Sequence, residues 1–388
     1  MLRASALAGL LLATVSATPL LAQSEPVKIG VLVTLSGPPA VLGEHARDGV
    51  LLAEKVLGGK VGGLDAEVIV VDAEGKPDVA AQKARELVES QGADFVIGPI
   101  FSNVMGAIAG PVTGAGAFLL SPNAGPSTFA GANCNENVFV VSYQNDQMPK
   151  VLAEYMNTQG IGDAFLLAPN YQAGQDSLNG FKQQFKGSIG GELYVPLGQL
   201  DFSAELAQVA AMQPSAVYAF MPGGMGVNLV KQWAQAGLSN IPLMSAFTVD
   251  ETTLPAEQDA ALGMLSGSNW APDLDVPGNA EFVAAYRADY GRVPSIYAMA
   301  AYDSVMLIDS ALKAVGSTED KAALRAALKA ADFTSLRGNF AFSSNQFPVQ
   351  DFYLTKAVKR DDGSYQTSVV EKVFTDYADA YVGQCPLK

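Results

Sequence analysis

Short apolar runs alternate along the chain with stretches whose apolar residues recur at helical spacing. Residues 27–33 form the first run, and Ala46, Val50, Ala53 and Leu57 then recur every three or four positions. The other strands predicted in this half are 67–71, 94–98, 117–121 and 137–142, and the second predicted helix is 80–90. Strands that alternate with helices indicate βα units and a parallel sheet.

The same alternation restarts after Tyr143. The predicted strands are 164–168, 192–196, 216–220 and 241–245, and the predicted helices are 173–185, 203–212 and 227–236. The last third predicts helices over 282–290, 298–315 and 321–331 and strands over 340–342 and 352–358. We therefore expect an α/β protein with two mostly parallel sheets flanked by helices. Because ligands of such sheets bind beyond the carboxyl ends of the strands, two facing sheets predict a cleft between them.

The N-terminus predicts export. A mostly apolar run over residues 6–21 follows a weakly basic start at Arg3 and precedes polar residues from Gln23 onward. This pattern is typical of a secretory signal peptide, which we assign to residues 1–22, with cleavage near Ala22. The alternative is a membrane anchor, but the run is short for a span and is interrupted by hydroxylated residues and a proline. The cleavage site has no cysteine, so lipid anchoring there is not expected.

Length and charge narrow the class of protein. The 388 residues exceed what one hydrophobic core usually supports, which favours two lobes. The formal net charge of -15 argues against nucleic acid as a partner, because neutralising phosphates requires clustered Lys and Arg. No later stretch is long and apolar enough to cross a bilayer, so we expect a soluble mature protein.

Two cysteines, Cys134 and Cys385, occur in a chain that carries an export signal. An even number of cysteines in an oxidising compartment favours one disulfide, which would tie the C-terminus to a loop in the middle of the chain. The alternative is two unpaired buried thiols. Neither cysteine belongs to a CxxC pair, so a redox or zinc site has little support.

The chain has a single histidine, His45. A Ser-His-Asp or Cys-His catalytic set would have to use it, and no GxSxG, HExxH or GxxxxGK[ST] motif is present. We therefore expect no enzyme, no metal site and no cofactor. His45 lies near the start of the first predicted helix, either as a partly exposed helix residue or as part of a pocket.

Two loops are suited to holding an anion. Residues 98–103 (Gly-Pro-Ile-Phe-Ser-Asn) and 121–127 (Ser-Pro-Asn-Ala-Gly-Pro-Ser) each lie where a predicted strand ends and a helix begins. Free backbone N–H groups and the helix dipole favour a carboxylate at such turns without a paired arginine. The alternative is ordinary helix capping by Ser102 and Ser127.

These loops belong to a longer series of matches to one family. The matching segments are 29–31 (Ile-Gly-Val), 34–37 (Thr-Leu-Ser-Gly), 95–99 (Phe-Val-Ile-Gly-Pro) with Ser102, 120–122 (Leu-Ser-Pro), 171–174 (Tyr-Gln-Ala-Gly) and 235–238 (Gln-Ala-Gly-Leu). With them the chain resembles the branched-chain amino-acid (Leu/Ile/Val-binding) type of periplasmic solute-binding proteins of ABC importers. The resemblance covers nearly all of the mature chain.

The resemblance implies a two-lobed type I periplasmic binding protein, with three hinge crossings and the ligand between the lobes. The crossings fall near Ser142, Asn269 and Gly338. The N-terminal lobe is then 26–142 plus 270–337, and the C-terminal lobe is 143–269 plus 338–388. A monomer in the periplasm, which delivers its ligand to a membrane permease and its ATPase subunits, is the implied setting.

The departures from the family pattern bear on the ligand. Amino-acid binders of this family hold the α-carboxylate with a serine and backbone amides, a role that falls here on Ser102, Asn123 and Ala124. They bind the ammonium with a threonine and an acidic residue, and these positions carry Gly125 and, within a residue or two, Phe247. Because burying an ammonium without a carboxylate costs several kcal/mol, we expect an amino acid to be a poor ligand.

Aromatic side chains occupy the predicted cleft instead, and we expect about three of five to touch ligand. The candidates are Phe101, Tyr143, Tyr171, Phe247 and Trp270, and further candidate pocket residues are Leu35, His45, Pro222 and Gly223. The segments 121–127, 144–146 and 222–226 also resemble the subgroup that binds benzoate- and cinnamate-like acids. The predicted ligand is therefore a small aromatic carboxylate. The alternatives are an aliphatic branched-chain amino acid, amide or urea in the same fold, a sensory role, and, least supported, an exported enzyme.

Overall fold

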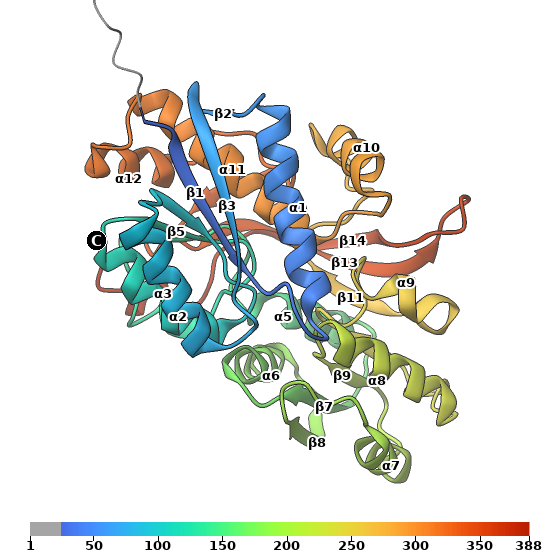
Figure 1. Cartoon of the computed structure of the whole chain (residues 1–388). Helices are drawn as coiled ribbons and strands as arrows, with labels where there is room; N and C mark the ends of the chain where they lie inside the picture. The colour runs from blue at the N-terminus through green and yellow to red at the C-terminus, as the bar shows by residue number, and fades with distance from the viewer. Residues whose placement is uncertain (1–24, 388) are drawn as a thin grey trace, which may run out of the picture.

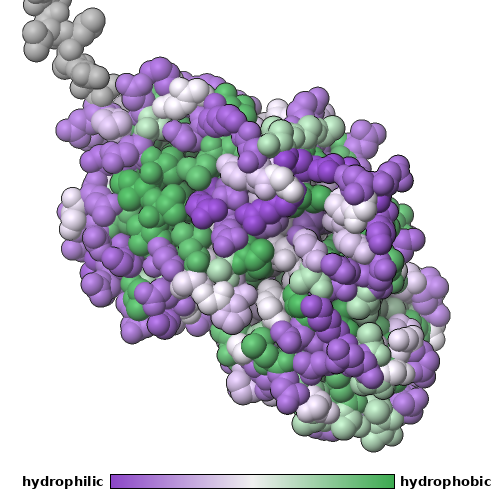
Figure 2. Space-filling model, turned by 45° about the vertical axis from the view of Figure 1, so that its right-hand side comes forward, coloured by the Kyte–Doolittle hydropathy of each residue, from purple (hydrophilic) through white to green (hydrophobic). Residues whose placement is uncertain are grey.

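The computed structural model describes residues 25–387, so the predicted signal peptide lies outside the described residues. The described chain forms two lobes, each built on its own sheet (Figure 1). The space-filling view shows a larger and a smaller part separated by a constriction, with a hydrophobic area on the larger part among hydrophilic residues (Figure 2). The predicted two-lobed α/β fold is thus confirmed. No described helix is long and apolar enough to cross a membrane.

The first sheet has the order β2-β3-β1-β4-β5-β6 and is parallel except for β2. Its central strand β1 is buried over almost its whole length, as expected for a strand covered on both faces. The strands are β1 (Val27–Val33), β2 (Lys60–Val61), β3 (Leu64–Asp72), β4 (Phe95–Ile97), β5 (Phe118–Ser121) and β6 (Val138–Val140).

Helices cover both faces of the first sheet. Right-handed crossovers place α2 and α3 on one face and α1 on the other, where α11 packs along α1 (Figure 1). The helices of this lobe are α1 (Ala40–Val56), α2 (Pro77–Arg85, continued by a π-helical turn Glu86–Ser90), α3 (Ser102–Gly114), α4 (Ser127–Ala130), α10 (Asn279–Tyr290), α11 (Ile296–Val315) and α12 (Lys321–Ala330).

The second sheet has the order β12-β13-β11-β10-β9-β7-β8, with β14 on the free edge of β13. Strands β7 to β11 are parallel, and β13 joins β11, β12 and β14 in antiparallel pairs. The strands are β7 (Asp163–Pro169), β8 (Ser188–Val195), β9 (Val217–Ala219), β10 (Leu243–Ser245), β11 (Leu265–Ser268), β12 (Phe340–Phe342), β13 (Pro348–Lys359) and β14 (Tyr365–Tyr377). The helices are α5 (Gln147–Thr158), α6 (Gln172–Gln184), α7 (Ser203–Met212), α8 (Gly224–Gln235) and α9 (Leu254–Glu257), with 3-10 turns at Gln258–Ala261 and Val382–Gln384.

The chain passes between the sheets three times, after β6, after β11 and before β12, and these segments meet. The carbonyl oxygen of Ser142 accepts hydrogen bonds from Asn269 Nδ2 at 3.0 Å, Gln350 Nε2 at 2.7 Å and Arg337 Nη1 at 3.2 Å. Arg337 is itself buried and forms an ion pair with Asp303 at 3.0 Å. The lobe boundaries expected at 142, 269 and 338 remain predictions about where the hinges bend.

Candidate ligand-binding site

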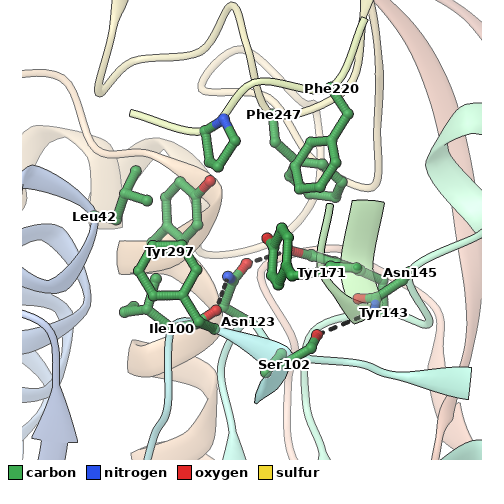
Figure 3. A pocket seen from close by; sticks show the side chains of 14 residues that line it. Leu42, Ile100, Ser102, Asn123, Tyr143, Asn145, Tyr171, Phe220, Phe247 and Tyr297 are labelled. Carbon is green, nitrogen blue, oxygen red and sulfur yellow. Dashed lines mark hydrogen bonds between the residues drawn. The ribbon is translucent and has the colours of Figure 1, made fainter. Parts of the chain in front are cut away.

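A small cavity lies between the lobes, at the carboxyl ends of both parallel sheets (Figure 3). This position is the one that parallel α/β sheets favour for ligands. The lining residues are Leu42, Ile100, Phe101, Ser102, Asn123, Ala124, Tyr143, Asn145, Tyr171, Ala173, Phe220, Pro222, Phe247 and Tyr297.

Uncharged donors line one end of this cavity. Ser102 is the first residue of α3, so its hydroxyl and the open N-terminus of the helix lie together. Asn123 and Ala124 follow β5 in the neighbouring loop. Among residues 25–387, no group accepts a hydrogen bond from the backbone N–H of Ser102, Asn123 or Ala124. These N–H groups and the Ser102 hydroxyl can therefore receive an anion.

The side chain of Asn123 is committed to holding the loop in place. Its Nδ2 donates to the carbonyl oxygen of Ile100 at 2.6 Å, and its Oδ1 accepts from the Tyr143 hydroxyl (Figure 3). Ser142 Oγ also donates to the carbonyl oxygen of Asn123 at 3.0 Å. Because both the side chain and the carbonyl are occupied, the N–H is the polar group of Asn123 that remains for a ligand.

Aromatic rings form the other walls, and they come from both lobes. Phe247 lies 4.9 Å from Tyr143 and meets Phe220 edge-on at 5.3 Å, measured between ring centroids. Tyr171, from the second lobe, lies 6.1 Å from Phe101 of the first in an edge-to-face arrangement. Such distances fit favourable ring contacts. Phe247 also has a left-handed backbone, with φ of 59°, which is uncommon for a bulky residue and turns this loop toward the cleft.

The lining contains no charged side chain. Burial is the main cause that raises the pKa of Tyr143 and of Tyr171, so both phenols stay protonated at neutral pH. Behind the Phe247 wall, burial likewise raises the pKa of the Asp250 carboxyl, and its Oδ2 has no hydrogen-bond partner among the described residues. A ligand in this cavity therefore meets neutral donors and rings.

Eight of the predicted site residues line this cavity together. They are Phe101, Ser102, Asn123, Ala124, Tyr143, Tyr171, Pro222 and Phe247.

Two predicted glycines lie next to the cavity without lining it. A Cβ on Gly125 would stand 1.8 Å from the carbonyl oxygen of Tyr143, and the Gly125 N–H donates to Asn145 Oδ1 at 3.2 Å. No side chain fits there, so close backbone approach accounts for this glycine. A Cβ on Gly223 would lie 3.4 Å from Pro39 Cα, across the cleft mouth.

Three other predicted site residues, Leu35, Trp270 and His45, do not line the cavity. Leu35 packs against the core and donates its N–H to Asp72 Oδ1 at 2.8 Å. Trp270 is fully buried, with its Nε1 donating to Asn279 Oδ1 at 2.8 Å.

His45 is 1% exposed and lies 5.8 Å from the ring of Tyr286, so the expectation of a partly exposed helix residue is wrong. Burial, followed by the positive charge of Arg292, lowers the pKa of His45 well below its usual value. Helix α1 turns this side chain into the protein interior, because the helix is covered on that side by α10 and α11.

Six lining residues were not predicted, and some of them carried a signal. Phe220 follows β9 directly, at the carboxyl end where ligands bind, and Asn145 lies in the segment 144–146 that marks the aromatic-acid subgroup. Ile100 lies in an anion loop already identified. Ala173 lies in the family-matching segment 171–174, whereas Leu42 and Tyr297 lie on helices and had no such signal.

Residues 26–364 match the model of the periplasmic binding protein family. This chain belongs to that family. A curated relative, Leu/Ile/Val-binding protein homolog 6 of Brucella melitensis, is 28% identical over 90% of this chain and 92% of its own length. The resemblance to branched-chain amino-acid-type solute-binding proteins of ABC transporters is thereby confirmed. Family and fold are those of transporter binding proteins rather than of enzymes, and the family is periplasmic.

Solved structures are similar over almost the whole chain. A solute-binding protein of an ABC transporter from R. palustris, in complex with benzoate, is 32% identical with a TM-score of 0.88 and covers 94% of this chain and 100% of its own. Another solute-binding protein of an ABC transporter, from Rhodopseudomonas palustris BisB5 in complex with 3,4-dihydroxybenzoic acid, is 29% identical with a TM-score of 0.86. It covers 92% of this chain and 99% of its own. A branched-chain amino-acid binding protein from Streptococcus pneumoniae, in complex with isoleucine, is 24% identical with a TM-score of 0.80, covers 90% and 100%, and shares the fold.

Proposed function

We propose that this protein is the periplasmic solute-binding subunit of an ABC importer for a small aromatic carboxylate of the benzoate, phenylacetate or cinnamate kind. One observation carries the proposal: the cavity offers uncharged donors at one end and rings on its other walls, with no acidic side chain for an ammonium. The benzoate and dihydroxybenzoate complexes of its relatives support the same ligand class.

The energetics are compatible with tight binding. Covering a ring of roughly 120 Å² at about 25 cal/mol per Å² contributes about 3 kcal/mol. Hydrogen bonds from Ser102 and the loop amides to a carboxylate contribute about 2 kcal/mol each. After the costs of association, such a sum supports a micromolar or tighter complex.

Capture proceeds by hinge closure. The first lobe receives the carboxylate at Ser102, and the second lobe brings Tyr171, Pro222 and Phe247 over the ring. The closed monomer presents a surface that the permease recognises, and the partner ATPase supplies the energy of transport. An aliphatic amino acid, amide or urea is the competing ligand class, because the fold also occurs in an isoleucine complex.

Titration calorimetry on the mature protein tests the ligand class. We expect benzoate or a hydroxycinnamate to bind at least 100-fold more tightly than leucine, because a leucine ammonium would be buried without a carboxylate partner. Tighter binding of leucine would reject the proposal.

A single substitution tests the anion end. Ser102→Ala should weaken benzoate binding about 30-fold, the loss of one charge-assisted hydrogen bond, and weaken benzamide binding much less. Equal losses for the two ligands would remove Ser102 from the anion site. Ser317→Ala, in the segment between α11 and α12 and far from the cleft, is the matched control.

A further inference from the structure

A buried carboxylate lies just behind Ser102, outside the cavity lining. Asp176, on α6 of the second lobe, is 4% exposed. Its Oδ2 accepts from the Ser127 N–H at 2.9 Å and from Asn145 Nδ2 at 2.9 Å, and its Oδ1 accepts from Ser127 Oγ at 2.7 Å and Gln172 Nε2 at 2.8 Å. All four partners are donors, which suits a carboxylate that acts only as an acceptor.

Asn145 connects this carboxylate to the ligand site. Its Nδ2 donates to Ser102 Oγ at 3.1 Å (Figure 3). The same Nδ2 donates to Asp176 Oδ2, and Asn145 Oδ1 accepts from the Gly125 N–H. A flipped amide would place its oxygen against the Asp176 carboxylate and its NH₂ against the Gly125 N–H. Both contacts are repulsive, so the surrounding groups fix one orientation of the amide.

This orientation fixes the polarity of the Ser102 hydroxyl. An amide NH₂ can only donate, so Ser102 Oγ is the acceptor of that bond and its own proton is directed elsewhere. No described residue accepts that proton. A serine hydroxyl held in this way presents a donor to the cavity, as a carboxylate ligand requires.

We propose that Asn145 and Asp176 are positioning residues, which orient the Ser102 hydroxyl as a donor and make that orientation depend on lobe closure. The inference rests on the proposed function, because the ligand carboxylate is the acceptor assigned to the Ser102 hydroxyl proton. Ser127 and Ser102 belong to helices of the first lobe and Asp176 to a helix of the second, so opening the cleft separates Asp176 from Ser127. The Asp176 carboxylate, which orients the Asn145 amide, is therefore held in place only when the lobes are closed.

The test compares benzoate with benzamide, a neutral ligand of the same shape, by calorimetry and stopped-flow kinetics. Asp176→Asn removes the charge that orders Asn145, and we expect the preference for benzoate over benzamide to fall about 10-fold. In the Ser102→Ala background the same substitution should leave the preference unchanged, because the hydroxyl on which it acts is gone. Ser127→Ala removes the hydroxyl bond between the lobes, keeps the bond from the backbone N–H of residue 127 and does not touch Asn145, so it should speed the dissociation of both ligands equally.

The chain offers a matched control. Asp163 accepts from the N–H of Ser215 at 3.0 Å and from its hydroxyl, the same pair of bonds that Ser127 makes to Asp176, but far from the cleft at the start of β7. Asp163→Asn should change neither affinity nor preference.

The outcomes separate the two proposals. Equal weakening of both ligands by Asp176→Asn, or the same effect in the Ser102→Ala background, would reduce Asp176 to a structural role and overturn the inference alone. If wild-type protein binds leucine rather than benzoate, the proposed function and the inference both fail. Should Asp176→Asn not fold, Asn145→Ala takes its place, because it removes the donor and leaves Asp176 bonded to Ser127 and Gln172.

Discussion

Two tyrosine hydroxyls in the cavity are not used by the protein itself. Neither Tyr171 nor Tyr297 has a hydrogen-bond partner for its hydroxyl among residues 25–387, although Tyr297 is only 1% exposed. Both rings line the cavity (Figure 3). A polar substituent on the ligand ring that forms a hydrogen bond with one of these hydroxyls gains about 1 kcal/mol.

Tyr297→Phe should therefore change selectivity among aromatic acids. We expect the affinity for a hydroxybenzoate to fall about 10-fold and the affinity for benzoate to stay within twofold, measured by calorimetry. Tyr286→Phe is the control, because the Tyr286 hydroxyl has no hydrogen-bond partner among the described residues and lies away from the cavity. An equal loss of affinity for hydroxybenzoate and benzoate would show that the Tyr297 hydroxyl stabilises the cavity wall and does not bind the ring substituent.

Single residues of the site could be predicted where a strand leads into them. Ser102 lies at the end of the loop that follows one apolar strand and Asn123 lies within the loop that follows another, and strand ends are where parallel sheets bind ligands. Tyr297 follows a loop into α11, and its arrival at the cavity depends on how the last helices return to the first lobe. Trp270 lies near a predicted crossing, yet the bond to Asn279 draws its ring into the core. The periodicity of the sequence cannot show that the Tyr297 ring reaches the cavity whereas the Trp270 ring is buried in the core.

Helices and strands were predicted well where they alternate along the chain and less well where strands follow one another directly. The predicted parallel strands of both lobes follow the expected order, with differences of a few residues at their ends, but the parallel strand β11 and the helix α5 were not predicted. The long antiparallel strand β14 was missed, because its two buried residues, Gln366 and Thr367, are polar and its partner β13 had been assigned as a short strand. The Asp-Asp-Gly turn before it, residues 361–363, was the available hairpin signal.

The segment between β10 and α9 gathers buried acids against β14. Glu251 Oε1 accepts from the N–H of Thr367 at 2.7 Å and from its hydroxyl at 2.6 Å. Burial, and next the charge of Asp250, raises the pKa of Glu251 to about 7. Since the folded pKa lies above the unfolded value of about 4.3, Glu251 contributes its full stability below pH 4 and loses it as the pH rises through 7.

Glu251→Gln should flatten this dependence. Glutamine keeps the oxygen that accepts from Thr367 but cannot ionise, so we expect its free energy of unfolding to fall less between pH 5 and 8 than that of the wild type. The difference between the two curves should reach about 2–3 kcal/mol, since each unit of pKa shift corresponds to 1.36 kcal/mol. Urea titrations at several pH values measure it. Glu319→Gln, at an exposed position, should run parallel to the wild type, and parallel behaviour of Glu251→Gln itself would contradict the assignment.

On the scale of the whole molecule, the C-terminus of the second lobe returns to the first. After β14 the chain runs back beside the first lobe (Figure 1), and Cys385 forms the predicted disulfide with Cys134. A second tie lies beside it, because Asn345 Nδ2 donates to the carbonyl oxygen of Ala130 at 2.8 Å and to Asp379 Oδ2 at 3.0 Å. The lobes are thus connected by these ties as well as by the three crossings.

Removing the disulfide should lower stability but spare the ligand site. The bond joins residues 251 positions apart, and a loop of that size can contribute up to about 5 kcal/mol by restricting the unfolded chain. We expect the double variant Cys134→Ser, Cys385→Ser to unfold at a lower temperature than the wild type. The stabilisation by benzoate should persist in both, because neither cysteine lines the cavity and Asn345 still holds the tail. Calorimetric melting with and without benzoate measures both effects. If the variant keeps its melting temperature but loses the benzoate response, the bond acts on the closed arrangement of the lobes, and its role belongs to binding instead of folding.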